Sequence, residues 1–139
     1  MVAEKTRSPD LVVGQSAGGW ASIALSSVNP PRVRAIITFA AGRVDGKPNN
    51  NCAPDRLVEA TADFGRTSRV PMLWIYIEND TFFGPVLSKR MHEAYTGAGG
   101  NAEYHLLPPF GSDGHFLISS PDSIPLWAPL VGPFLDKHG

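Results

Sequence analysis

Short apolar runs alternate with amphipathic segments along the chain. Four runs have the length and the β-branched or aromatic content of buried strands, at residues 11–14, 33–40, 70–77 and 102–107. Helical spacing of apolar residues marks residues 17–28, 55–67, a segment that ends at the glycines of 97–100, and the carboxyl-terminal segment. This alternation predicts an α/β fold: a mostly parallel sheet of about four strands with helices on both faces.

Residues near the ends of these elements refine the prediction. Asp55 is placed to cap the second helix, after a long polar loop at residues 41–55. Pro133 removes a backbone donor from the middle of the terminal segment, so we predict a kink there or two short turns.

Composition limits the classes of function. With 139 residues the chain forms a single domain over residues 1–139, large enough to bury a core. Its 18% charged residues and net charge of −1 argue against a nucleic-acid partner. Residues 1–9 lack the apolar core of a signal peptide, and no run approaches the roughly 18 apolar residues of a membrane span. Cys52 is the single cysteine, which excludes an internal disulfide and makes it a poor metal ligand.

Three polar residues follow the carboxyl ends of predicted strands: Ser16, Asp80 and His115. Loops at this edge of an open parallel sheet converge on one crevice, where ligands bind. The order Ser, Asp, His is also that of an α/β-hydrolase triad. In such a triad Ser16 would be the nucleophile and His115 the general base, and Asp80 would orient the imidazole.

The sequence Gly14-Gln15-Ser16-Ala17-Gly18 joins a strand to a helix and fits a strained turn that presents the serine hydroxyl. We expect Gly14 and Gly18 to be needed because a Cβ at either position would crowd the neighbouring strand or helix. The Ala17 amide, at the start of the helix, would donate to an oxyanion.

Ordinary structural roles stay open for each residue. Ser16 could be a helix cap, Asp80 could cap the helix near Gly84, and His115 could bond a backbone carbonyl. Two other carboxylates compete with Asp80 for the role of the acid: Asp113, which we favour as a turn residue, and Glu78. The remaining histidines are His92, expected to face solvent on a helix, His105 in a strand and His138 in a frayed tail. None has a second ligand at metal spacing, so no metal site is predicted.

Aromatic residues lie near these candidates in the sequence: Trp20, Phe82, Phe83 and Phe116. They could form an apolar pocket for an acyl or alcohol group, although Trp20 fits a plain core position at least as well. The loop at residues 42–54 could help to cover the crevice.

Three stretches resemble one known family: "VVGQSAGG" around Ser16, "PMLWIYIENDTFFGP" at residues 71–85 and "FGSDGHFLI" at residues 110–118. Over nearly its whole length the chain resembles the carboxyl-terminal half of an α/β-hydrolase, and most of all the serine esterases related to dienelactone hydrolase. The resemblance implies a triad of Ser16, Asp80 and His115 without metal or organic cofactor. Dienelactone hydrolases proper carry Cys as the nucleophile, so Ser16 favours a small carboxylic ester as substrate.

The resemblance also implies that several strands, and a loop with a second oxyanion donor, precede the nucleophile strand in complete members. Loss of one such donor typically costs about 100- to 1,000-fold in turnover. The strand at 11–14 would become an apolar edge, so we expect a homo-oligomer paired there, cover by residues 1–10, or a fragment of a longer protein. The alternative function is a catalytically weak or inactive hydrolase domain that serves in assembly or binding. A nucleotide-binding domain is disfavoured, because residues 14–19 match neither phosphate-binding motif.

Overall fold

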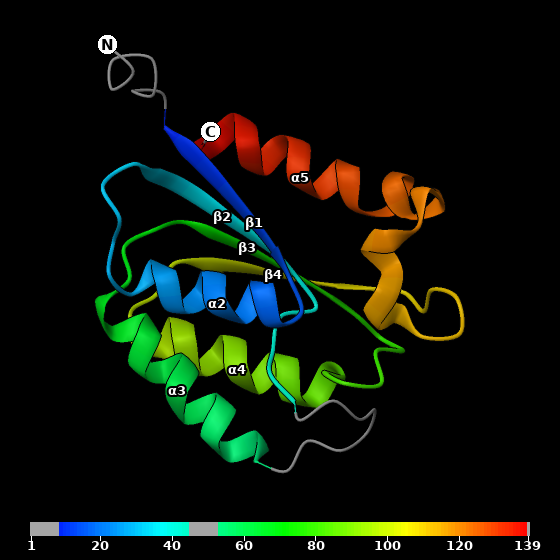
Figure 1. The fold of residues 1–139 in the computed structure, drawn as a ribbon, viewed down its shortest axis with the longest axis horizontal. Coiled ribbons are helices and arrows are strands. Elements are labelled where there is room, and N and C mark those ends of the chain that lie inside the picture. The colour runs from blue at the N-terminus through cyan, green and yellow to red at the C-terminus, as the bar shows by residue number, and fades with distance from the viewer. Residues whose placement is uncertain (1–8, 45–52, 139) are drawn as a thin grey trace.

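The structure of this protein is a computed structural model that describes residues 9–44 and 53–138 (Figure 1). Predictions for Cys52, for most of the loop at 42–54 and for residues 1–8 as an edge cover lie outside the described residues. The strands are β1 (Asp10–Gln15), β2 (Val33–Phe39), β3 (Met72–Ile77) and β4 (Ala102–Leu107). The helices are α2 (Ala17–Ser26), α3 (Pro54–Thr67), α4 (Pro85–Gly97) and α5 (Ile124–His138), with two short 3-10 turns, Gly114–Ser119 and Pro121–Ser123, before α5.

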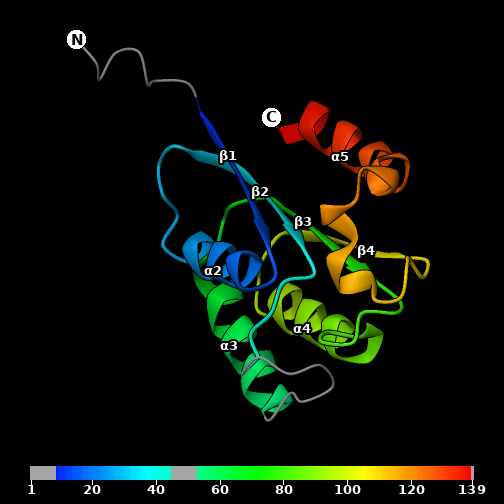
Figure 2. The same cartoon turned by 45° about the vertical axis from the view of Figure 1, so that its right-hand side comes forward.

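The four strands form one parallel sheet in the order β1-β2-β3-β4, which confirms the predicted fold class. Because spatial order follows sequence order, the three crossover helices α2, α3 and α4 all lie on the same face of the sheet (Figure 1). Helix α5 lies on the opposite face, as the second view also shows (Figure 2). β1 and β4 are therefore the two edges, and β2 and β3 are central.

Alternating side chains of the central strands build one core on each face. On the crossover-helix face Ile36, Trp74 and Tyr76 pack with residues of α2, α3 and α4. On the other face Ile37 and Ile75 pack in a second cluster with Phe134 and other apolar residues of α5. All six residues of β3 are buried, which explains why this stretch reads as an uninterrupted apolar run.

In the carboxyl-terminal segment, α5 is one helix that includes both Pro129 and Pro133. The expectation of two short turns is wrong. Both prolines are exposed, whereas Phe134 is buried against the sheet. Water can satisfy the carbonyl groups that lack an intrahelical donor on the solvent side, while the apolar face keeps the helix on the sheet.

Three smaller predictions are also wrong. Asp55 does not cap α3: Ala53 occupies the cap position, Pro54 begins the helix, and Asp55 pairs with Arg90 across the surface. His92 is half-buried, because its face of α4 packs towards β4 and its Nε2 lies 2.7 Å from the Ala102 carbonyl oxygen. His138 was predicted to lie in a frayed tail, but it belongs to a helix.

His138 is the last residue of α5, where its ring packs against Phe134. None of the helices within 9–44 and 53–138 is both long enough and apolar enough to cross a bilayer.

Candidate active site

Ser16 occupies a sharp turn between β1 and α2. Its backbone has φ 54° and ψ −121°, a conformation that costs an L-residue energy and persists only when the surroundings enforce it. The Ser16 amide donates to the Phe39 carbonyl at 2.9 Å, and the Ser16 carbonyl accepts from Trp20 N and Gly42 N. These bonds fix the turn to β2 and to the first turn of α2, so the hydroxyl has a defined direction.

Two glycines make this turn sterically accessible. A Cβ at Gly14 would lie 2.5 Å from the Gly18 carbonyl oxygen and 2.4 Å from Ser22 Oγ, so Gly14 is required as predicted. The same expectation for Gly18 is wrong, because nothing lies within 4 Å of a Cβ there. The close approach occurs one residue later, where a Cβ at Gly19 would lie 2.7 Å from Ala41 Cβ. Gly19, which the spacing argument missed, is the residue that lets α2 approach the loop after β2.

Ser16, His115 and Asp80 form a continuous hydrogen-bonded set. His115 Nε2 lies 3.0 Å from Ser16 Oγ, and His115 Nδ1 lies 3.1 Å from Asp80 Oδ2. The Asp80 side chain is fully buried and that of His115 is 5% exposed. Since an ionised carboxylate only accepts hydrogen bonds, Nδ1 carries the proton of neutral His115 and Nε2 is left to accept from the serine hydroxyl.

The ordinary roles considered for these three residues do not describe their contacts. Ser16 stands at the cap position of α2, but its side chain makes no capping hydrogen bond. Asp80 accepts from the amides of Phe82 (2.7 Å) and Phe83 (2.9 Å), inside its own loop and before α4 begins. The His115 ring contacts the Asp80 carboxylate and the Ser16 hydroxyl, which are side-chain groups, rather than a backbone carbonyl.

The two competing carboxylates are in different positions. Glu78 is exposed at the end of β3. Asp113 contacts His115, but through the backbone: its Oδ1 accepts from the His115 amide at 3.0 Å. Burial raises the pKa of Asp113, but its hydrogen bonds to Thr81 and to the His115 amide outweigh that effect and hold the pKa below its ordinary value of 3.8.

Two amide side chains that the sequence reasoning did not single out hold the loops of the site. Gln15 Nε2 donates to the His115 carbonyl at 3.3 Å. Asn79 accepts from the Phe110 amide at 2.9 Å and donates to the Phe110 and Gly111 carbonyls, both at 3.1 Å. The signal in the sequence was their position: Gln15 directly precedes Ser16, and Asn79 directly precedes Asp80.

The candidate aromatic residues separate into two groups. Phe82 and Phe116 border the His115 ring, with centroid distances of 4.4 Å and 5.2 Å, and Phe116 is 53% exposed. Phe83 is fully buried and belongs to the core on the crossover-helix face. Trp20 packs edge-on against Phe64 of α3, which fits its alternative reading as a core residue. Of the aromatic residues that border the His115 ring, the half-buried Phe82 and the exposed Phe116 are thus the ones with surface left to meet a ligand.

Tyr76 is a further ionisable group near Asp80. Burial, with smaller contributions from Tyr104 and Asp80, raises the pKa of Tyr76 far above its ordinary value of 10.0. Its phenol is therefore neutral and donates to the Ala41 carbonyl at 2.9 Å. Within the part of the chain that the structure describes, no three His, Cys, Asp or Glu side chains are grouped so that they could hold a metal ion.

The sheet, its helices and the position of the strand-end loops define the chain as part of an α/β-hydrolase fold. An esterase domain from a Rhodothermus marinus protein matches 94% of this chain with a TM-score of 0.65 and 21% identity. A Klebsiella pneumoniae protein provisionally identified as a dienelactone hydrolase matches 88%, with a TM-score of 0.62 and 19% identity. Acylaminoacyl peptidase of Pyrococcus horikoshii matches 95%, with a TM-score of 0.66 and 13% identity.

The chain spans 61%, 50% and 24% of the lengths of these three structures, respectively. No protein-family profile and no curated protein sequence matches it. At such low identities the likeness establishes the fold, and a shared fold does not by itself assign a reaction.

Proposed function

We propose that this chain is a serine hydrolase that cleaves a small carboxylic ester through an acyl-enzyme, with Ser16, His115 and Asp80 as its triad. One observation carries the proposal: the continuous hydrogen bonding from Ser16 Oγ to His115 Nε2 (3.0 Å) and from His115 Nδ1 to Asp80 Oδ2 (3.1 Å). A serine hydroxyl is a weak nucleophile unless a base within hydrogen-bond reach removes its proton, and this geometry supplies such a base.

In the acylation step Ser16 Oγ attacks the ester carbonyl carbon while His115 Nε2 takes the hydroxyl proton. Negative charge builds on the carbonyl oxygen, towards which the Ala17 amide at the first turn of α2 would donate. Asp80 keeps the imidazole in its productive tautomer and stabilises the imidazolium. The tetrahedral intermediate collapses by breaking the bond to the alcohol oxygen, which leaves with the proton from His115.

In the deacylation step water replaces the alcohol. His115 Nε2 takes a proton from the water, whose oxygen attacks the acyl carbon, and the same proton returns to Ser16 Oγ as the acid departs. Ester and water are thereby converted into one acid and one alcohol, and neither a metal nor an organic cofactor is required. The Phe82 and Phe116 rings beside His115 favour an apolar group on one side of the ester.

A fluorophosphonate probe tests the proposal directly. Its phosphorus accepts the activated serine oxygen and loses fluoride, so the protein should gain one covalent label, measured by intact mass. Ser16→Ala should abolish labelling and His115→Ala should slow it strongly. Ser88→Ala serves as the matched control, because Ser88 is buried and bonded to Tyr104 in the core and should not affect labelling. Folded protein that stays unlabelled would refute the proposal.

A second candidate function, an assembly module, is favoured by β1, which is an edge strand of the sheet formed by the described residues. The amide of Asp10 donates to the carbonyl of Arg32, just before β2, and the amide of Ser16 donates to that of Phe39 at the end of β2, so the intervening alternation turns the amides of Leu11, Val13 and Gln15 away from β2. Leu11 is 44% and Val13 58% exposed. Such an edge is a template for pairing with another strand.

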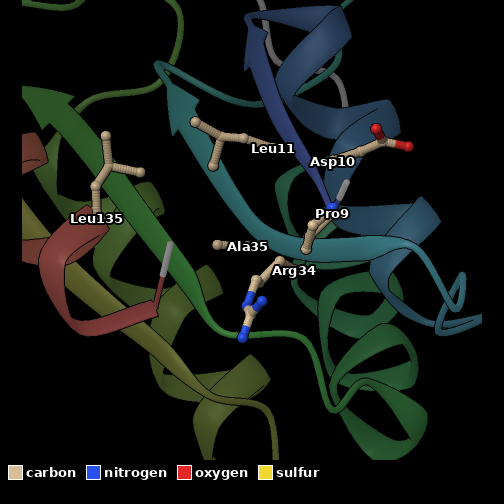
Figure 3. A pocket seen from close by; sticks show the side chains of 6 residues that line it. All are labelled: Pro9, Asp10, Leu11, Arg34, Ala35 and Leu135. Atoms are coloured by element: carbon tan, nitrogen blue, oxygen red, sulfur yellow. The ribbon is translucent and has the colours of Figure 1, made fainter. Parts of the chain in front are cut away.

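The apolar side chains near this edge continue into a groove beside α5. Leu11 and Leu135 flank Ala35 across the groove, while Asp10 points to the other side of β1 (Figure 3). The groove has a volume of about 250 Å³ and is completed by Pro9 and Arg34. We propose that a second copy pairs antiparallel here, centred on Val12, since that register sets Leu11 opposite Val13 of the other copy in hydrogen-bonded pairs.

Val13→Lys tests this pairing, because a lysine on an edge strand opposes strand addition. Light scattering should give the wild type twice the mass of the 14.9 kDa chain and the variant the mass of one chain. Val86→Lys is the control, since Val86 is equally apolar and 77% exposed, and it lies near the start of α4, in the crossover between β3 and β4. A wild-type protein that is monomeric at millimolar concentration would exclude self-pairing.

A further inference from the structure

Asp113 links the two loops that carry the acid and the base. Its Oδ1 accepts from the His115 amide at 3.0 Å and from the Thr81 amide at 3.2 Å, and its Oδ2 accepts from Thr81 Oγ1 at 2.6 Å. Thr81 directly follows Asp80 in the loop after β3, whereas Asp113 and His115 follow β4. One carboxylate thus holds the backbone next to both residues.

A turn residue alone would need only part of this arrangement. Asp113 also caps the 3-10 turn Gly114–Ser119 through the His115 amide, and that bond by itself would account for an Asp at this position. The two bonds to Thr81 reach 32 residues along the chain and contribute nothing to the turn. Their effect is to fix the distance between the loop after β3 and the loop after β4.

We propose that Asp113 is a positioning residue of the ester hydrolysis, which sets the contact between Asp80 and His115 by tying their loops together. The inference rests on the proposed function. It assigns Asp113 no contact with substrate and no proton transfer, because its carboxylate faces backbone amides and a threonine hydroxyl rather than the imidazole.

The state of the Asp113 carboxylate agrees with this role. Its pKa lies below the ordinary value of 3.8, so it is ionised wherever the enzyme would work and can accept all three hydrogen bonds at once. A depressed pKa means that the stabilisation is present above the ordinary pKa and is lost as the pH falls through the folded-state value. Bonds to a charged acceptor are also the stronger ones.

The test compares Asp113→Ala with Asp113→Asn in a nitrophenyl ester assay. The alanine variant should lower kcat by about 10- to 100-fold, because a small misplacement of catalytic groups has an effect of that size, and should leave KM nearly unchanged. The asparagine variant should retain kcat to within about threefold. Its Oδ1 can accept from both amides, and its Nδ2 can donate to Thr81 Oγ1.

Two further variants provide a substitute for Asp113→Ala and a control. Thr81→Val removes the 2.6 Å bond to Asp113 Oδ2 and leaves Asp113 in place. It should also lower kcat, and it replaces Asp113→Ala as the test if that variant does not fold. Asp122→Ala removes an exposed carboxylate from the adjacent 3-10 turn and should leave kcat and KM unchanged. The melting temperature of each variant distinguishes unfolding from a displacement of Asp80 and His115.

An NMR measurement gives a readout that does not depend on activity. Long-range ¹H–¹⁵N spectra of the histidine rings should show His115 protonated at Nδ1 in the wild type and in Asp113→Asn, and a mixture of tautomers in Asp113→Ala. If the wild type labels with fluorophosphonate but Asp113→Ala keeps wild-type kcat and tautomer, this inference is overturned and the proposed function stands. If the wild type does not label, the proposed function fails, and an unchanged tautomer in Asp113→Ala overturns the inference as well.

Discussion

Asp80→Asn is expected to lower kcat for a nitrophenyl ester by about 10⁴-fold with the fold intact. The side-chain oxygen of the asparagine would keep the bonds from the Phe82 and Phe83 amides, so its NH₂ group would face His115 Nδ1. Two donors cannot share one hydrogen bond, and the imidazole would turn to the tautomer with its proton on Nε2. That nitrogen could then no longer accept the proton of Ser16.

Steady-state kinetics and a thermal melt of the same preparations check this prediction. Glu78→Gln is the matched control: it removes a carboxylate two residues away that is exposed at the end of β3, and should change kcat by less than about threefold. A severe loss in Glu78→Gln together with near-normal activity in Asp80→Asn would transfer the role of the acid to Glu78.

Gly14→Ala and Gly18→Ala should have different effects on stability although they flank the same serine. The new methyl at position 14 would lie 2.5 Å from the Gly18 carbonyl oxygen, which α2 holds in place, so the free energy of unfolding should fall by about 1–3 kcal/mol. The methyl at position 18 would meet nothing within 4 Å, and the better helix propensity of alanine should leave stability unchanged or raise it by up to about 1 kcal/mol.

Urea unfolding of the two variants and the wild type measures this difference. The pair is internally controlled, because both changes add one methyl group to the same turn. Equal destabilisation by the two variants would mean that α2 does not approach β1 as described, and would also remove the steric account of the Ser16 turn.

Much of the fold was predictable because strands buried on both faces leave an unmistakable apolar run. The four strands, the parallel sheet and helices on both faces all follow from that pattern. The sequence also placed Ser16, Asp80 and His115 at strand ends, and in a parallel sheet those ends meet at one edge. Topology therefore brought the three residues near one another before any side-chain geometry was considered.

Features that depend on the packing of one element against another were not predictable. The roles of Gly18 and Gly19 differ only by the rotation of α2 relative to the loop after β2. His92 sits on a half-polar helix whose inward face is decided by where β4 runs. The bonds of Asp113 to Thr81 join two loops that are 32 residues apart, and no periodicity encodes such a contact.

The order of the sheet has a consequence for how the protein folds. Each strand pairs with the next one along the chain across a single helix, so the scaffold can assemble through successive strand-helix-strand units, more slowly than a helical bundle because parallel strands pair through non-local contacts. The bond between Ser16 and His115, by contrast, spans 99 residues and closes only when the first and last parts of the chain have both docked. The chemical reactivity of one serine would then report the completion of folding, later than any signal from helix or strand formation.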